Sequence, residues 1–310
     1  MTIETLQSAT GAALNVYVGL AKNPKGVVQI NHGLAEHAAR YQAFAQALNE
    51  AGYHVYAHDH RGHGGTVAAD APAGMFAPDG GAAKVIADVE AVHATIAERY
   101  PGLPVITFGH SMGGLIALNH AIVHPARAAG LAIWNANFSA GALGRLAQGI
   151  LKFERFRLGH DVPSRMLPKL TFGVWAKSIK NARTNFDWLS RDESVVDAYI
   201  ADPLCGWDAS VAMWQDIFEL VFAGADDGNL AKLPRNLPLN IHGGGRDPAT
   251  DFGKASEALA SRFLALGFTN TAISINPQSR HESLNEIDRE MTIAAFTEWA
   301  NSVVANWQKA

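Results

Sequence analysis

One serine in the sequence stands in a setting that can activate a hydroxyl group. Gly109-His110-Ser111-Met112-Gly113 has the pattern G-x-S-x-G, and it lies between an apolar run at 105–108 and helical spacing at 112–124. A serine on such a tight strand-to-helix turn exposes its hydroxyl as a nucleophile, and only small neighbours fit beside it. A serine that merely caps the helix is the alternative. The strand–turn–helix context favours the nucleophile, so we predict that Ser111 attacks a carbonyl carbon.

A serine nucleophile needs a base to take its proton, and on this kind of turn the chain order is serine, acid, histidine. His281 follows an apolar run at 271–275 and is the only histidine beyond His242. We therefore predict that His281 is the base. Glu282 is a poor candidate for the acid that orients it, because adjacent side chains do not readily pair in this way.

The orienting acid should lie in a loop at the carboxyl end of a strand. Asp247 lies in such a loop, shortly after the apolar run at 238–241. Asp251 is the alternative, but we expect it to lie in the cap region of the next helix. We predict that Asp247 fixes the tautomer of His281 and stabilises its charged form.

Two backbone N–H groups must stabilise the negative oxygen that forms when the serine attacks. One belongs to the residue after the serine, which is Met112. The second should come from the loop after an earlier strand, and the run at 27–30 ends in His32-Gly33-Leu34. We predict that Leu34 is this donor, although a strand-to-helix turn that simply needs glycine is the alternative.

The elements that must position these residues alternate along the chain. Strand-like apolar runs lie at 27–30, 53–57, 104–108, 129–134, 238–241 and 271–275. Helical patterns lie at 40–51, 81–100, 112–124 and 252–266, with a last one from 286. The opening segments 3–8 and 13–20 resemble a hairpin at the edge of a sheet. Continuous apolar strands that alternate with helices predict an α/β fold, in which helices cover both faces of a mainly parallel sheet.

Residues 138–230 interrupt this alternation and show no clear strand, so we predict a helical insertion between core parts 1–137 and 231–310. The charges within the insertion are separated. Residues 141–183 carry nine Lys or Arg and two acids, whereas 184–228 carry one Arg and ten acids. Two solvated helical faces are the simplest interpretation.

Apolar residues in the basic half of the insertion recur at three or four positions, so they would share one face of a helix. They are Leu143, Leu146, Ile150 and Phe153. This face either packs on the core or forms a surface that binds acyl chains or a membrane. Lys152, Arg155 and Arg157 lie nearby and would attract anionic lipid.

The composition excludes several classes of protein. The 310 residues carry a formal net charge of −4 and lack a basic stripe, so no nucleic-acid partner is expected. The first ten residues lack the basic start and apolar core of a signal peptide, and one cysteine allows no intrachain disulfide. We expect a cytoplasmic enzyme without a cofactor or obligate protein partner, because a serine triad with its oxyanion hole suffices.

Four motifs together resemble the monoacylglycerol lipase and lysophospholipase branch of the α/β-hydrolases. They are His32-Gly33-Leu34-Ala35-Glu36-His37 with Arg40-Tyr41, Ala57 to Gly64, Gly109 to Gly114, and His281 to Glu286. Within the insertion, 188–192 and 202–206 resemble bacterial members. At Gly64-Gly65-Thr66 relatives usually end the turn in serine, a departure in a structural turn.

The resemblance implies an ester hydrolase acting on single-chain acylglycerols, lysophospholipids or simple esters. It also implies that residues 138–230 form a mobile lid over the acyl pocket. The apolar face around Leu146 and the basic residues beside it would give this lid transient contact with a membrane surface.

Four other functions compete with this one. His58, His60 and His63 have the spacing of a metallo-β-lactamase-type site, but Gly62 stands where that pattern needs an aspartate and no second ligand cluster follows. A non-catalytic receptor would tolerate loss of a triad residue, yet all three are present. Ser111 excludes a dehalogenase, which needs a carboxylate nucleophile. An aminopeptidase stays open, because it shares the acyl-enzyme chemistry.

Overall fold

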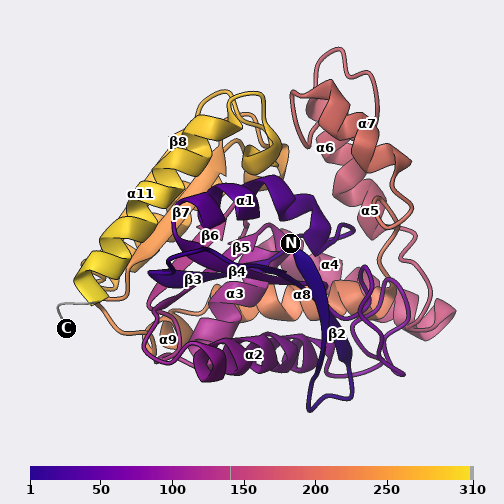
Figure 1. The fold of residues 1–310 in the computed structure, drawn as a ribbon. Coiled ribbons are helices and arrows are strands. Elements are labelled where there is room, and N and C mark those ends of the chain that lie inside the picture. Colours follow the sequence, from indigo (N-terminus) through magenta and orange to yellow (C-terminus); the bar gives the residue numbers. More distant parts are fainter. Residues whose placement is uncertain (140, 308–310) are drawn as a thin grey trace.

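The computed structural model describes residues 1–139 and 141–307, which form one eight-stranded sheet covered by helices (Figure 1). The strands are β1 (Thr2–Gln7), β2 (Ala13–Gly19), β3 (Gly26–Asn31), β4 (Tyr53–His58), β5 (Val105–His110), β6 (Gly130–Trp134), β7 (Leu239–Gly244) and β8 (Thr271–Asn276). Their order in the sheet is β1-β2-β4-β3-β5-β6-β7-β8.

The α-helices of the described residues fall into a core set and an inserted set. The core set is α1 (Gln42–Glu50), α2 (Gly81–Arg99), α3 (Met112–Val123), α10 (Lys254–Ala265) and α11 (Arg289–Trp307). The inserted set is α4 (Ala142–Leu158), α5 (Leu167–Leu170), α6 (Phe172–Ser178), α7 (Glu193–Ala201), α8 (Val211–Gly224) and α9 (Asp227–Leu230).

The sheet has the predicted direction of pairing. β1 and β2 form an antiparallel hairpin at one edge, and β2 joins β4 antiparallel, whereas β4, β3, β5, β6, β7 and β8 pair in parallel. Every residue of β3, β4, β5 and β6 is buried, as expected for parallel strands with both faces covered. The predicted α/β fold with its mainly parallel sheet is confirmed.

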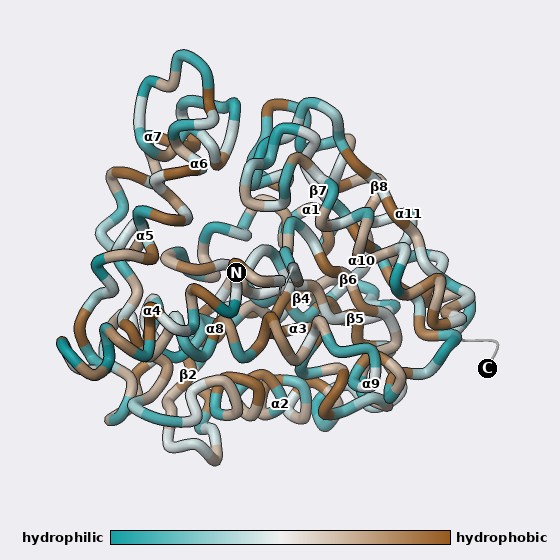
Figure 2. Tube along the Cα trace, turned by 180° about the vertical axis from the view of Figure 1, so that it is seen from behind, coloured by the Kyte–Doolittle hydropathy of each residue, from teal (hydrophilic) through white to brown (hydrophobic). Residues whose placement is uncertain are grey.

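Helices cover the two faces of the sheet in separate layers. On one face α1 and α11 bury Phe44 and Phe296 against Phe108 of β5. On the other face α2, α3 and α10 pack with side chains such as Val89 and Ile116 in a second cluster. Figure 2 shows the hydrophobic stretches of the chain on α3 and among the strands, where these layers meet. The carboxyl ends of the parallel strands are therefore held rigidly at one edge.

Helices α4 to α9 all lie in the chain between β6 and β7, where the insertion is predicted. α8 packs against α3 and α2, while α5, α6 and α7 stand to one side of the sheet (Figure 1). The boundaries of the insertion at 138 and 230 stay a prediction. Among the described residues no helix combines the length and apolarity that crossing a membrane requires.

The apolar face predicted for α4 does not pack on the core. Leu143 is 82% exposed and Leu146 and Phe153 are also exposed, whereas Ile150 is half-buried. The side that α4 buries carries Leu151 instead. Three of the four residues therefore lie outside the core, and of this face Ile150 packs against the main cluster.

Candidate active site

The turn between β5 and α3 holds Ser111 in a strained backbone conformation. Its φ of 54° and ψ of −121° lie in a region that non-glycine residues rarely adopt, and its N–H donates to the carbonyl of Trp134 at 2.9 Å. A Cβ atom on Gly109 would lie 2.1 Å from the carbonyl oxygen of Gly113. The glycines of the motif are thus required by close backbone contact, and the turn projects Ser111 from the end of the sheet.

The structure brings Ser111, His281 and Asp247 together, although more than 130 residues separate the serine from the aspartate. The Oγ atom of Ser111 lies 2.9 Å from Nε2 of His281, and Nδ1 of His281 lies 2.9 Å from Oδ2 of Asp247. Both His281 and Asp247 are buried. This is the geometry in which an imidazole takes a proton from a serine while a carboxylate orients its ring.

Asp247 is held as a carboxylate by its hydrogen bonds. Burial opposes ionisation, but the charge and hydrogen bond of His281, together with bonds from Asn135 and Thr250, hold the pKa of Asp247 below its usual value. Asn135 Nδ2 and Thr250 Oγ1 donate to Oδ2 at 3.0 and 2.9 Å, and the Ala249 N–H donates to Oδ1 at 2.9 Å. Asn135 could not be identified from the sequence, because a single asparagine after a strand carries no recognisable pattern.

Asp251, the alternative acid, lies at the beginning of α10 as expected. It is exposed and sits two residues before the N-cap Gly253, and its carboxylate accepts from the Lys254 ammonium at 3.2 Å rather than capping the helix. Asp247, and not Asp251, is the aspartate that hydrogen-bonds to His281.

The two predicted oxyanion donors, Leu34 and Met112, border the same cavity as Ser111. Met112 is the first residue of α3, so its N–H has no acceptor within the helix. The loop of Leu34 is pinned beside it, because the Gly33 N–H donates to Oε1 of Glu36 at 2.6 Å. The backbone at both positions is therefore fixed before a substrate binds.

A buried ionic network supports this loop, and its role was not predicted from the sequence. Arg40 donates to Oε2 of Glu36 at 2.6 Å and to both carboxylate oxygens of Glu282 at 2.6 and 2.7 Å, and Tyr41 donates to Glu36 at 2.9 Å. His110 packs against it and bonds the carbonyl of His281 at 2.9 Å. The charged residues in the motif around Glu36 are the sequence feature that could have indicated this network.

The network gives its buried members opposite pKa shifts. Burial opposes ionisation of Glu36, but His110 and Arg40 hold the pKa of Glu36 well below its usual value. Burial alone would lower the pKa of His110, yet the Glu36 carboxylate outweighs it and the pKa of His110 is raised. Glu36, which binds the oxyanion loop, thus remains an anion in the interior.

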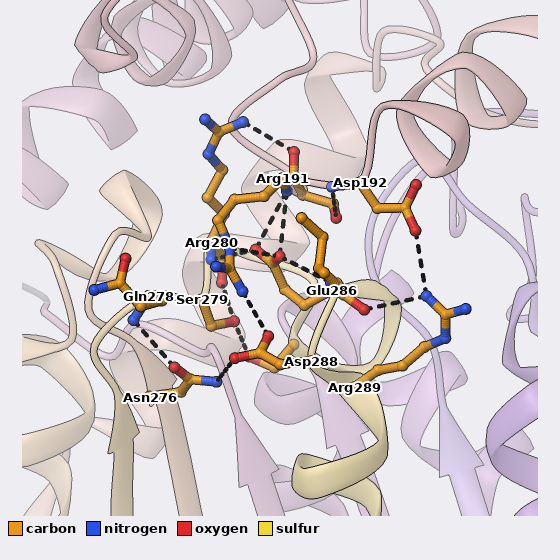
Figure 3. Close-up of polar contacts among 12 residues, drawn as sticks. Arg191, Asp192, Asn276, Gln278, Ser279, Arg280, Glu286, Asp288 and Arg289 are labelled. Atoms are coloured by element: carbon orange, nitrogen blue, oxygen red, sulfur yellow. Dashed lines mark hydrogen bonds and ion pairs between the residues drawn. The ribbon is translucent and has the colours of Figure 1, made fainter.

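The loop that carries His281 is held by the insertion through buried charges. Figure 3 shows Arg191 of the insertion directed at Glu286 and Asp288, which follow β8. Arg191 Nε lies 2.8 Å from Oε2 of Glu286, and Nη2 lies 2.5 Å from Oδ1 of Asp288. Oε1 of Glu286 also accepts from the Arg280 N–H at 2.7 Å. Glu286 is fully buried, so it connects the two segments on either side of His281.

Backbone contacts reinforce this attachment. The His281 and Glu282 N–H groups donate to the carbonyls of Trp188 and Leu189 at 3.3 and 2.7 Å. The Arg280 guanidinium donates to the Ser190 carbonyl at 2.9 Å. The position of the predicted base therefore depends on residues of the insertion.

A cavity of about 230 Å³ opens beside Ser111 and His281. The insertion supplies its aromatic lining, which consists of Phe172, Trp175, Phe186, Trp188, Tyr199, Trp207, Trp214 and Phe218. Glu36 and Glu282 are the carboxylates among its lining residues, and both are bonded to Arg40. The cavity suits an apolar group attached to a polar group at Ser111.

The histidine run considered as a metal site is a set of buried rings. The rings of His32, His58, His60 and His63 pack against one another in tilted and edge-on contacts, with the centroids of His58 and His60 4.7 Å apart and those of His32 and His60 4.4 Å apart. Burial lowers the pKa of His58 to about 3. Two groups of side chains in the described residues converge closely enough to bind one ion, and neither includes this run.

Comparison with known proteins identifies the family. The model of the serine aminopeptidase S33 family matches residues 22–288. The chain belongs to this family. The match spans both parts of the core and the insertion between them.

Monoacylglycerol lipase from Mycolicibacterium smegmatis is 28% identical over 89% of this chain and 88% of its own length. Human monoglyceride lipase is 32% identical over 58% of this chain and 52% of that enzyme. The structure of a thermostable carboxyl esterase from Bacillus coagulans superposes with a TM-score of 0.89 at 25% identity and covers 98% of both chains. The predicted resemblance to monoacylglycerol lipases within the α/β-hydrolases is confirmed.

Proposed function

We propose that the protein is a serine carboxylic-ester hydrolase in which Ser111, His281 and Asp247 form the catalytic triad. The observation that carries the proposal is the continuous chain of contacts from Ser111 Oγ through His281 to the buried Asp247, each 2.9 Å long. Such contacts at the edge of an aromatic cavity support nucleophilic attack on an ester. The relatives named as lipases and esterases support the same reaction.

Each step then has a residue to perform it. His281 Nε2 takes the Ser111 proton as Oγ attacks the ester carbonyl, and the N–H groups of Leu34 and Met112 stabilise the oxyanion. The imidazolium returns the proton to the leaving alcohol, which leaves an acyl-serine. Water, deprotonated by His281, attacks the acyl-serine and releases the acid and the free serine. Asp247 stabilises the imidazolium throughout, and no cofactor is required.

The cavity favours a substrate with one apolar chain. Its aromatic side chains can enclose an acyl group, whereas the polar atoms near Ser111 can contact a small headgroup. Monoacylglycerols are hydrolysed by relatives according to their names, and lysophospholipids present a similar single chain. We propose single-chain lipid esters as the substrate class.

The family name makes an aminopeptidase the second candidate. Such an enzyme must pair the positive amine of its substrate with a carboxylate. The carboxylates that border the cavity, Glu36 and Glu282, already share the Arg40 guanidinium within the described residues. This occupied pair favours the ester hydrolase.

The exposed apolar residues of α4 support contact with a lipid surface. Leu143, Leu146 and Phe153 are exposed, and Lys152 and Arg157 lie on the same helix. We include in the proposal that this part of the insertion acts as a lid and touches membranes transiently. A cytoplasmic location stays a prediction.

Mutation of the triad tests the proposed function. Ser111→Ala and His281→Ala should each lower kcat for p-nitrophenyl butyrate by roughly 10⁴- to 10⁶-fold, and Asp247→Asn somewhat less. Asp251→Asn is the matched control and should retain activity, and a serine-directed phosphonate should label Ser111 alone. A crippled Asp251→Asn variant with a normal Asp247→Asn variant would refute the assignment of the acid.

A substrate panel separates the two candidate functions. Rates should be measured for p-nitrophenyl esters of increasing chain length, monoacylglycerols, lysophospholipids and aminoacyl anilides. The proposed function requires hydrolysis of the single-chain esters. Faster cleavage of the anilides would establish the aminopeptidase instead.

A further inference from the structure

A histidine, an aspartate and a cysteine meet outside the catalytic cavity, where the insertion touches the oxyanion loop. His37 follows that loop, while Asp202 and Cys205 follow α7. The possible ligand atoms of the three side chains lie within 4.8 Å of one another. We propose that His37, Asp202 and Cys205 form a binding site for Zn²⁺, which ties the insertion to the oxyanion loop.

The distances suit a metal ion of this size. Nε2 of His37 lies 2.8 Å from Oδ2 of Asp202. Bonds of about 2.0 Å in a tetrahedral zinc site place nitrogen and oxygen ligands about 3.3 Å apart, so the pair must separate by only about 0.5 Å. His37 is buried and the other two side chains are half-buried, which leaves a path for the ion from solvent.

The turn after α7 presents its two ligands in a fixed arrangement. Oδ1 of Asp202 accepts from the Leu204 N–H at 2.9 Å, which leaves Oδ2 directed at His37. The Cys205 N–H donates to the Asp202 carbonyl at 3.0 Å and closes the turn. A second interaction of the carboxylate orients a metal ligand in the same way in known sites.

Zinc binding requires that the thiol of Cys205 is deprotonated and that the imidazole of His37 is neutral. Zn²⁺ would replace the thiol proton, which passes to water, and would bind neutral His37 and the Asp202 carboxylate. A water molecule would complete the fourth position.

The ion would strengthen a contact that already exists. The Gly206 N–H and the Tyr199 hydroxyl both donate to the carbonyl of Ala35 at 2.9 Å. Ala35 is the neighbour of Leu34, so a metal ion at His37 would restrain the loop that carries this proposed oxyanion donor. The site itself does not depend on the proposed function.

A second group of side chains provides a matched control. Glu90, His120 and His124 also lie within 4.8 Å of one another, between α2 and α3. Both carboxylate oxygens of Glu90 are already engaged, one by Arg127 at 2.5 Å and the other by His120 at 2.8 Å. This group lacks a thiolate, which binds zinc strongly, and so it serves as the control.

Cobalt titration of the full-length protein under reducing conditions tests the site. Cys205 is the only cysteine, so a thiolate-to-cobalt charge-transfer band in the near ultraviolet can arise only there. The wild type should develop this band with one equivalent of Co²⁺ and lose it when Zn²⁺ is added. Absence of the band would overturn the proposal.

Two variants locate the ion by competition with a chromophoric zinc chelator. Cys205→Ser removes a direct ligand and should bind Zn²⁺ at least roughly 100-fold more weakly. Even the loss of a group that only supports a ligand can cost up to about 100-fold in affinity. His124→Gln should bind it normally. Zinc should also raise the melting temperature of the wild type and of His124→Gln but not of Cys205→Ser. If Cys205→Ser melts lower than the wild type without metal, Asp202→Asn replaces it. Unchanged affinity in the cysteine variant, or loss in His124→Gln, would refute the site.

Discussion

Residues 141–183 and 184–230 are halves of one insertion, yet they are attached to the molecule in different ways. The second half supplies α8, whose side chains such as Met213 and Leu220 are buried in the main core cluster. It also holds the His281 loop through Arg191 and the oxyanion loop through Tyr199. This half therefore contacts both loops of the candidate site directly.

The first half rests mainly on the second. α4 packs on α8 through Leu151, and Arg155 bonds Gln215 of α8 at 2.9 Å. Its outer side exposes large apolar groups, including Phe156, which is 89% exposed. Phe172 and Trp175 nevertheless border the cavity.

This difference indicates that the two halves have different roles in the predicted lid. Movement of 184–230 would break buried ion pairs and displace the predicted base, whereas movement of 141–183 would break fewer buried contacts. We therefore propose that only the first half moves as a lid, and that the second half is a fixed part of the active site.

The largest effect is expected from the buried anchor of the second half. Glu286→Gln removes a fully buried carboxylate that bonds Arg191 and the Arg280 N–H. The free energy of unfolding should fall by about 4 kcal/mol, because the Arg191 guanidinium and the Arg280 N–H both lose a charged acceptor. kcat should fall roughly 100-fold as His281 shifts. Urea denaturation and ester hydrolysis measure both quantities.

The matched control is an exposed ion pair of the same insertion. Asp197 bonds Arg183 at 2.6 Å at the surface, and Asp197→Asn should change neither quantity appreciably. Equal effects of the two variants would mean that the second half is no more firmly anchored than the surface.

The next effect concerns the contact of α8 with α2. Asp216 is buried and accepts from the Ala82 N–H at 3.1 Å, and burial raises the pKa of Asp216 to about 7 from 3.8. The folded state therefore binds a proton that the unfolded state releases between about pH 4 and 7. The free energy of unfolding should fall as pH rises through this range, by on the order of 3 kcal/mol.

Asp216→Asn should remove this loss, because the amide does not titrate. Asp226 is exposed, so Asp226→Asn should show the same dependence of the free energy of unfolding on pH as the wild type. Urea denaturation at pH 5 and pH 8 measures it, and an unchanged slope in Asp216→Asn would show that this carboxyl is ionised in the fold.

A smaller, substrate-dependent effect is expected in the first half. Leu146→Asp should leave the melting temperature and hydrolysis of a short soluble ester unchanged, since Leu146 is 61% exposed and lies outside the cavity lining. Turnover of long-chain monoacylglycerol in vesicles should fall about tenfold, because the variant loses the free energy gained when one leucine side chain is buried in lipid. kcat/KM for both substrates measures this difference.

Leu151→Ala is the control on the same helix. Leu151 is fully buried, so this change should lower stability by about 3 kcal/mol and affect both substrates alike. The same pattern for Leu146→Asp would mean that the exposed face does not contact lipid.

The smallest effect should come from the charges beside this face. Lys152→Gln or Arg157→Gln should each weaken association with anionic vesicles about fivefold, near 1 kcal/mol for the lost charge. The loss should disappear at high salt. Co-sedimentation measures it, with Lys232→Gln, outside the insertion, as the control. Salt-independent binding would exclude the electrostatic contribution.

Local patterns were sufficient to predict the core elements. Apolar runs and helical spacing identified the parallel strands and core helices, because burial on both faces imposes a continuous apolar sequence. The last helix begins at Arg289 rather than at the predicted Glu286. The reason is tertiary, since the Glu286 side chain bonds Arg191 and the backbone of Arg280 before the helix starts.

The sequence by itself determined the candidate triad, because a glycine-flanked turn and the chain order left one serine and one histidine to choose. Only the tertiary structure decided what surrounds them. The bonds of Arg40 to Glu282, of Asn135 to Asp247 and of Arg191 to Glu286 join residues about 95 or more positions apart. The sequence also could not decide whether Leu143 and Leu146 point to the core or to solvent, because helical spacing defines a face but not the partner that it meets.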